Sequence, residues 1–284
     1  MRLLNINGRL SLTVNDGAVD VETVSAGKFS SSFQDALDRW EEFCLWARGL
    51  DSAPGQAYTP SELGAPVGTP RQIFAIGLNY RGHAEENNIE LPDTPMVFTK
   101  FASSIAGPFG DITMPPGSVD WEAELVVVIG RHARHVPAGQ AWDYVAGLTA
   151  AQDLSERDLQ IKPPGPQQFS LAKSYPGFAP LGPALVTPDE FADPDDLEIS
   201  CSVGDDQVQH ARTGDLIFSV PTLVSYLSSI LPLFPGDLIF TGTPDGVGFA
   251  MSPQRYLQPG EELITVIEGI GTMRHRMVVQ QDQQ

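Results

Sequence analysis

Several kinds of residue are scarce in this sequence, and each shortage excludes a class of protein. Two cysteines in 284 residues are too few for a disulfide framework. Cys44 lies on an apolar helical stripe and Cys201 alternates in phase with apolar neighbours, so we expect two small core residues in a reducing compartment. The 17 basic residues are outnumbered by 36 acidic ones, for a formal net charge of -19. This balance argues against a nucleic-acid or anionic-membrane surface, which needs clustered Lys and Arg.

Long apolar runs and several catalytic motifs are lacking as well. The longest apolar runs, such as residues 125–129, are far too short to span a bilayer. The first twelve residues have no basic start followed by a continuous apolar stretch, so no signal peptide is expected and a soluble, cytoplasmic protein is the prediction. The sequence has no G-x-S-x-G, H-E-x-x-H or G-x-x-x-x-G-K-[ST] motif, which removes the nucleophile elbow, the zinc-protease helix and the phosphate loop.

The first part of the chain, residues 1–69, is expected to form a small α/β domain with a linker. Asp16-Gly17 between two strand-like runs predicts a tight hairpin. Apolar residues at helical spacing between Phe33 and Ala47 predict one helix, whose Trp and Phe side chains serve packing. A stretch rich in Pro and Gly, residues 54–70, predicts the linker.

The remainder, residues 70–284, has short β-like runs punctuated by Gly and Pro. One clear helix, with Pro221 in its first turn, interrupts them. Strands without regularly alternating helices favour an α+β fold that is mainly β, with a mixed, largely antiparallel sheet. The runs expected to be strands are 72–76, 96–98, 124–129, 144–150, 197–203, 237–240 and 262–267.

Two glutamates precede the most apolar of these runs. If residues 125–129 form a buried strand, Glu122 and Glu124 point to the same side, because side chains alternate across a strand. Two carboxylates on one face repel each other, and a hard cation that prefers oxygen ligands, such as Mg²⁺, Mn²⁺ or Ca²⁺, would relieve that repulsion. Solvated surface carboxylates are the alternative.

A third carboxylate, that of Asp153, ends another apolar run. Such a place on rigid structure suits a metal ligand. Asp is also a preferred N-cap residue, so Asp153 could instead begin a helix at Leu154. The residues alone leave both interpretations open.

Other segments carry weaker signals. Lys173 stands between apolar residues and a turn rich in Pro and Gly, where a surface lysine is the alternative to a functional one. His83 has Glu86 three residues further on, so on a short helix Glu86 would orient His83 as a general base, or the two would form a plain ion pair. Residues 241–248 are rich in Gly and lack the lysine of a phosphate loop, and we interpret them as a tight loop that offers hydroxyls and backbone N–H groups to a small anion.

Taken together and in this order, six segments resemble the fumarylacetoacetate hydrolase family, in its branch of acylpyruvases and 2-hydroxyhepta-2,4-diene-1,7-dioate isomerases. The resemblance covers residues 71–277. The segments are IGLNYRGHAEE, DWEAELVVVIG, QDLSERDLQ, LAKSYPGFAPLGP, SVPTLVSYLS and FTGTPDGVG. One departure is Tyr-Pro-Gly after the lysine–serine pair, where family members often carry Phe-Asp-Thr.

The resemblance implies a role for each matching residue. It implies a mixed β-roll or barrel-like catalytic fold, a homodimer and a bound Mg²⁺, or Mn²⁺ or Ca²⁺ in its place. Lys173 would bind the substrate or polarise its oxygen, and His83 with Glu86 would activate water. The metal ligands would be Glu122, Glu124 and Asp153, and the substrate-binding residues would be Tyr80, Arg157, Gln160 and Thr243.

The resemblance also implies a reaction on a small 2-oxo or β-diketo acid. Because both His83 and Glu86 are present, hydrolysis of a C–C bond in an acylpyruvate-like substrate is the expected reaction. The alternative on the same metal site is decarboxylation or keto–enol isomerisation of a 2-oxo acid. A non-catalytic small-molecule binding protein on the same scaffold is the third hypothesis.

Overall fold

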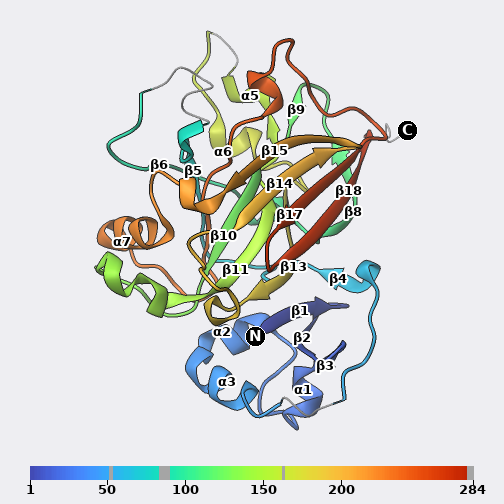
Figure 1. Ribbon diagram of the computed structural model, residues 1–284, viewed down its shortest axis with the longest axis vertical. Coiled ribbons are helices and arrows are strands. Elements are labelled where there is room, and N and C mark those ends of the chain that lie inside the picture. The colour runs from blue at the N-terminus through green and yellow to red at the C-terminus, as the bar shows by residue number, and fades with distance from the viewer. Residues whose placement is uncertain (51–53, 83–89, 162–163, 280–284) are drawn as a thin grey trace.

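A large mixed sheet runs through the computed structural model, which describes residues 1–50, 54–82, 90–161 and 164–279 (Figure 1). Its strands follow the order β3-β2-β1-β13-β11-β10-β16-β5-β6, with β4 paired to β1 and β7 to β13. This open path runs from β3 to β6 without closing on itself among the described strands. The strands are β1 (Arg2–Ile6), β2 (Arg9–Val14), β3 (Gly17–Asp20), β4 (Leu63–Gly64), β5 (Ile73–Gly77), β6 (Met96–Thr99), β7 (Ile105–Ala106), β10 (Ala123–Ile129), β11 (Val145–Gln152), β13 (Ala179–Val186) and β16 (Leu238–Phe240).

A second sheet of five strands packs on one face of the first, and a two-stranded ribbon pairs with the strands of neither sheet. Most neighbouring strands are antiparallel; the parallel pairs are β16 with β5, β13 with β7 and β18 with β8. The five-stranded sheet has the order β15 (Asp206–Arg212), β14 (Glu198–Val203), β17 (Glu262–Ile267), β18 (Gly271–Val279) and β8 (Phe109–Met114), and the ribbon pairs β12 (Ser155–Glu156) with β9 (Val119–Asp120).

Helices are short and peripheral (Figure 1). The longest described helix, α7, presents Leu223, Val224 and Leu227 to the core between the sheets. No helix in the described part of the chain is long and apolar enough to cross a membrane. The α-helices are α1 (Val21–Val24), α2 (Phe33–Asp38), α3 (Trp40–Ala47), α5 (Arg157–Ile161), α6 (Phe169–Ala172) and α7 (Val220–Ile230).

The position of β10 explains the apolar run at residues 125–129. Leu125 and Val127 face the core between the two sheets, whereas Val126 and Val128 face a second core on the opposite side of the large sheet. A strand that is buried on both faces shows a run of apolar residues instead of alternation. All seven of its residues are buried.

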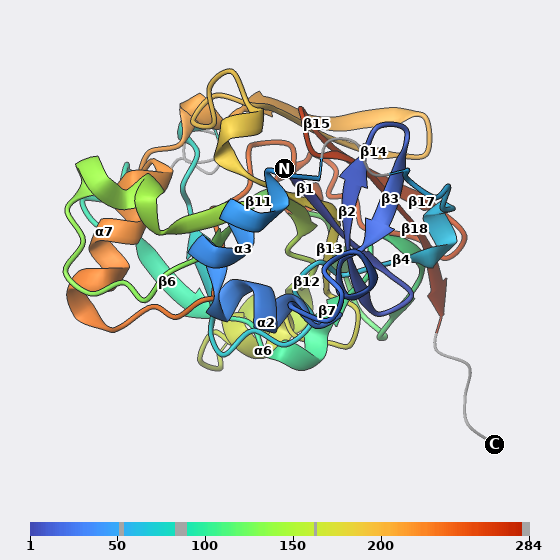
Figure 2. The same cartoon turned by 90° about the horizontal axis from the view of Figure 1, so that it is seen from below.

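The N-terminal segment builds that second core. Strands β1 to β3 extend the large sheet through the pairing of β1 with β13, and α2 and α3 lie beside them (Figure 2). Within this core the Phe43 ring packs against Phe29 at 5.3 Å and Trp40 at 5.7 Å between ring centroids. The predicted packing role of this aromatic stripe is confirmed. The division at residue 69 stays a prediction.

Two local predictions in this segment were wrong in detail. The hairpin turn is Asn15-Asp16, because Val14 pairs with Gly17 and Asn15 takes the left-handed conformation, with φ +51°. The predicted single helix is two helices, which break at Arg39. The Arg39 guanidinium donates to the Lys28 carbonyl at 2.8 Å and covers the Phe29 ring, so a long-range contact outweighs helix continuity.

Predictions for the rest of the chain were closer. The seven expected runs form β5, β6, β10, β11, β14, β16 and β17, and the expected helix is α7. The mainly β, largely antiparallel fold is confirmed.

Candidate metal centre and substrate site

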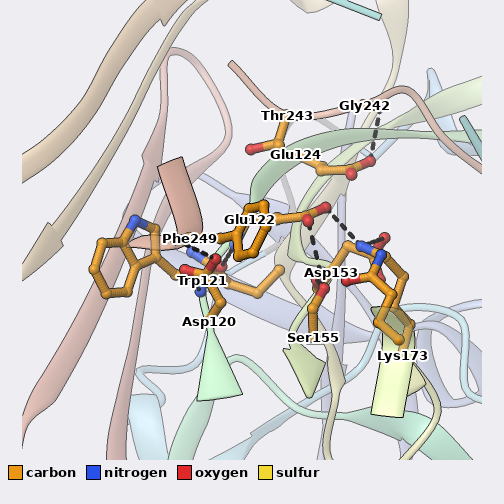
Figure 3. Close-up of polar contacts among 12 residues, drawn as sticks. Asp120, Trp121, Glu122, Glu124, Asp153, Ser155, Lys173, Gly242, Thr243 and Phe249 are labelled. Carbon is orange, nitrogen blue, oxygen red and sulfur yellow. Dashed lines mark hydrogen bonds and ion pairs between the residues drawn. The ribbon is translucent and has the colours of Figure 1, made fainter. Parts of the chain in front are cut away.

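Three buried carboxylates meet at the start of β10. Glu124 is the second residue of the strand and lies in the same row as Val126, while Glu122 directly precedes the strand. Asp153 directly follows β11, the antiparallel neighbour of β10. One ligand oxygen from each of Glu122, Glu124 and Asp153 lies within 4.8 Å of the others (Figure 3). The predicted orientation of the two glutamates and the arrival of Asp153 beside them are confirmed, and the surface alternative is wrong because all three side chains are buried.

The N-cap interpretation of Asp153 is wrong. The residues after it form strand β12, and helix α5 begins only at Arg157. The Asp153 carboxylate instead accepts hydrogen bonds from two lysine ammonium groups, those of Lys100 at 2.7 Å and Lys173 at 2.8 Å. Long-range contacts therefore hold this side chain.

Lys173 is a buried residue, not a surface lysine. Its Nζ lies 2.7 Å from Glu122 Oε2 and 2.8 Å from Asp153 Oδ2, so a positive charge already sits between two of the candidate ligands (Figure 3). Burial alone would lower the pKa of this ammonium group, but the charges of Asp153 and Glu122 outweigh burial and raise it. Lys173 is therefore held protonated.

Lys100 was not predicted as a site residue, although lysine is scarce in this sequence. It follows β6, is buried, and donates from Nζ to Asp153 Oδ1 and to the backbone carbonyl of Lys173. Burial lowers its pKa, and the Asp153 charge only partly compensates. Lys100 ties together one candidate metal ligand and the segment that carries Lys173.

Arg157 forms the other border of the cluster. Its guanidinium contacts Asp120 Oδ2 at 2.7 Å and Glu122 Oε1 at 2.8 Å, and it donates to Gln160 Oε1 at 2.8 Å. Burial opposes its charge, but Asp120 and Glu122 raise the pKa of Arg157 above its ordinary value.

Asp120 was not predicted as a site residue either. It lies two residues before Glu122, a spacing that places it on the same side of an extended chain.

Glu124 differs from the other carboxylates. No Lys or Arg side chain of the described residues pairs with it, and its Oε2 accepts a hydrogen bond from Gly242 N at 2.8 Å. Burial, followed by the charges of Asp153 and Glu122, raises the pKa of Glu124 well above its ordinary value. An all-oxygen set with surplus negative charge matches the preference of Mg²⁺, Mn²⁺ and Ca²⁺.

The predicted substrate residue Tyr80 is near enough to the cluster for the Glu124 charge to act on its phenol. Its side chain is 1 % exposed, and its hydroxyl has no hydrogen-bond partner among the described residues. Burial and then the Glu124 charge raise the pKa of this phenol. A buried hydroxyl without a partner is costly. Such a group is suited to a bound ligand or to water around an ion.

Backbone N–H groups of the loop after β16 donate hydrogen bonds to carboxylates of the protein itself. Gly242 N binds Glu124, while Gly248 N and Phe249 N bind Asp120 at 2.8 and 3.0 Å. Gly242 has φ +102°, and a Cβ there would lie 2.8 Å from Asn79 Cβ. Gly242 and Gly248 belong to residues 241–248, for which we had expected a small free anion, and their N–H groups bind protein carboxylates instead.

Thr243, Gln160, His83 and Glu86 are the remaining predicted residues. Thr243 is buried, and its hydroxyl donates to the Ala123 carbonyl at 2.9 Å and accepts from Gln209, so its contact with substrate stays a prediction. His83 and Glu86 lie outside the described residues, and their role stays a prediction. Gln160 is brought to the site through Arg157.

Comparison with known proteins agrees with this geometry. The family model for the fumarylacetoacetate (FAA) hydrolase C-terminal domain matches residues 72–278. The curated oxaloacetate tautomerase Fahd2a of Rattus norvegicus, a mitochondrial protein, is 43 % identical over 269 residues, which are 93 % of this chain and 85 % of the rat protein. The chain belongs to the fumarylacetoacetate hydrolase family.

Solved structures extend the likeness over the whole chain. A Mycobacterium smegmatis protein assigned provisionally as HpcE is 50 % identical, with a TM-score of 0.92 over 99 % of this chain and 100 % of that chain. Maleylpyruvate hydrolase from Sphingobium sp. SYK-6, solved with manganese(II) and pyruvate, is 27 % identical, with a TM-score of 0.83 over 99 % of this chain and all of that chain.

Proposed function

We propose that this protein is a divalent-metal-dependent tautomerase that interconverts the keto and enol forms of a small 2-oxo acid such as oxaloacetate. The observation that carries the proposal is the buried group Glu122, Glu124 and Asp153 with the Lys173 ammonium beside it. The tautomerase name of the rat relative supports the choice of reaction. Accordingly, isomerisation, first considered as the alternative to C–C hydrolysis, now comes first.

The three carboxylates would hold Mg²⁺, Mn²⁺ or Ca²⁺, and such an ion supplies Lewis-acid polarisation of the 2-oxo acid end of the substrate. Tautomerisation moves a proton between C3 and the oxygen on C2, so negative charge develops on that oxygen. The protonated Lys173 Nζ is a preorganised positive charge for it. Tyr80 offers a buried hydroxyl as a further donor.

The experiment follows a freshly dissolved enol of oxaloacetate by its ultraviolet absorbance, with and without enzyme. Enzyme with Mg²⁺ or Mn²⁺ should accelerate the decay of the enol without releasing carbon dioxide. Activity should disappear on exhaustive chelation and return when metal is added. Full activity in metal-free protein, checked by elemental analysis, would contradict the metal's role, and carbon dioxide release at the same rate would indicate a decarboxylase.

Hydrolysis of an acylpyruvate-like C–C bond is the second candidate, supported by the likeness to maleylpyruvate hydrolase over the whole chain. It needs an activated water, for which His83 and Glu86 are the candidates. His83→Ala should then reduce hydrolysis of a 2,4-dioxo acid by about two to four powers of ten and leave tautomerisation intact. A His83→Ala variant that hydrolyses as fast as wild type would remove this candidate. A cytoplasmic location and a homodimer belong to the same proposal.

A further inference from the structure

A groove of about 800 Å³ opens beside the carboxylate cluster. The Arg157 side chain is its wall toward the cluster, since Nη2 lies 2.8 Å from Glu122 Oε1 while the guanidinium carbon lies 5.8 Å from the Phe249 ring centroid. In the view of Figure 3, Phe249 and Lys173 lie on opposite sides of Glu122. Ligand pockets of about 300–1,000 Å³ hold molecules much larger than a four-carbon acid. Oxaloacetate alone therefore leaves this groove unexplained.

The lining of the groove is aromatic. Three half-buried rings, those of Tyr175, Phe249 and Tyr256, contribute to it together with the apolar side chains of Leu159 and Ile161. Tyr175 belongs to the segment in which this chain departs from the common family pattern. Aromatic walls favour a flat apolar group through burial and ring contacts.

The charges around the groove disfavour an anionic group. Arg157 is already matched by Asp120 and Glu122, so its positive charge is compensated. Glu156 and Asp158 also line the groove and add negative charge without a basic side chain paired to either among the described residues. Among the residues that the structure describes, a carboxylate placed here would meet like charge at Glu156 and Asp158.

From these observations we infer that the groove is the specificity site for a substituent that extends beyond the four carbons of oxaloacetate, and that it favours a flat, uncharged, aryl-like group there over a carboxylate. This assignment rests on the proposed function, which places the 2-oxo acid end of the substrate (its head) at the carboxylate cluster. The groove then determines which class of substituent (the tail) the substrate carries. Phe249 and Tyr256 are its specificity-determining residues.

Three inert ligands with the same head test this inference: oxamate, N-phenyloxamate and N-oxalylglycine, which carry no tail, a phenyl tail and a carboxylate tail. Calorimetric titration with Mg²⁺ present measures their affinities. N-phenyloxamate should bind wild type roughly ten-fold more tightly than oxamate, the upper range for a ring contact. N-oxalylglycine should bind no more tightly than oxamate.

Two variants test whether the additional affinity for N-phenyloxamate arises from the aromatic side chains of the groove. Phe249→Leu and Tyr256→Leu should each lower the ratio of N-phenyloxamate affinity to oxamate affinity to near one, while measurable oxamate binding shows that the variant is folded. Leu45→Ala, at a site 69 % exposed on α3, is the control and should change none of the three affinities. A phenyl advantage that survives both variants, or an N-oxalylglycine affinity above that of N-phenyloxamate, would overturn the inference.

Failure of the proposed function gives a different result. If all three ligands bind in the expected order but the oxaloacetate enol decays at its uncatalysed rate, the tautomerase proposal fails and the groove assignment stands. If oxaloacetate is tautomerised but the phenyl tail brings no gain, the groove assignment fails alone. If oxamate does not bind with metal present, the head position is wrong and the inference falls with it.

Discussion

Ion pairs occur in this protein in two different settings. In the site, Lys100 and Asp153 are both fully buried, and Lys173 and Arg157 are nearly so. In the N-terminal segment the pairs lie at the surface, where the Arg9 side chain is 45 % exposed beside Asp20 at 27 %. The distances are the same, 2.7 Å for both Lys100–Asp153 and Arg9–Asp20. Geometry alone therefore does not distinguish the two sets.

Their energetics do differ. Removing two charges from water costs several kcal/mol for each ion, and apolar residues of the same volume are often as stable or more so. Exposed pairs avoid this cost and contribute little. Four buried carboxylates (Asp120, Glu122, Glu124, Asp153) against three buried cations (Lys100, Arg157, Lys173) are thus a poor way to stabilise a core. Their presence indicates a requirement of function.

The largest effect is expected for Asp153→Asn. This change keeps the size of the side chain and removes one charge of the proposed metal site, so Mn²⁺ affinity should fall by more than about 100-fold, beyond the loss typical of a residue that only supports a ligand. Electron paramagnetic resonance of free Mn²⁺ measures the binding. An Asp153→Asn variant that binds Mn²⁺ as tightly as wild type would show that the buried cluster, like the surface ion pairs, does not serve to bind a metal.

Lys100→Met should have the next largest effect. It removes one of the two buried lysine partners of Asp153, so the metal-free protein should lose about 3–5 kcal/mol of stability. Added Mg²⁺ should restore part of that loss, since the ion supplies positive charge near Asp153 in place of the missing ammonium group. Urea unfolding with and without Mg²⁺ tests this. Lys100→Arg is the matched control that retains the charge.

A smaller, pH-dependent effect is expected at His275, a buried residue of β18 that has no charged partner among the described residues. Its ring lies 3.0 Å from the Gly107 carbonyl, and burial lowers its pKa below the ordinary 6.5. The imidazole binds a proton more readily in the unfolded chain than in the folded one. The free energy of unfolding therefore decreases as pH falls below about 6.5. His275→Gln should flatten the difference in urea midpoint between about pH 7 and pH 5. An identical pH dependence in both proteins would contradict this.

The smallest effect is expected for Asp20→Asn at the surface. Asp20 accepts hydrogen bonds from Arg9 and caps α1 through Thr23 N at 2.9 Å. Asn caps a helix about as well as Asp, so the change isolates the ion pair. Arg9 lowers the pKa of Asp20 to about 2, so the pair persists until strongly acid pH, yet its exposure limits its value. The urea midpoint at neutral pH should scarcely move, and a large shift would erase the contrast with the buried cluster.

Local periodicity was sufficient for much of the fold and part of the site. Alternation along the chain places Glu122 and Glu124 on one side of β10, and the apolar run after them predicts a buried strand, which in the structure is buried on both faces. Helical spacing predicts α7. The family resemblance supplied Asp153 and Lys173. Each of these predictions depends on residues that are close in sequence or on the order of segments along the chain.

Only the tertiary structure decided which charges meet. Lys100 reaches Asp153 across 53 residues, and Asp120 accepts the N–H of Gly248 across 128 residues. The break at Arg39 has the same origin, a contact with a ring ten residues away that no helical period encodes. The sequence by itself determined where the strands carry carboxylates, because side-chain direction in a strand is local. The sequence left open which lysines pair with those carboxylates, because buried charges meet their partners only when distant segments pack together. The free-energy cost of burying these charges also arises only from that packing.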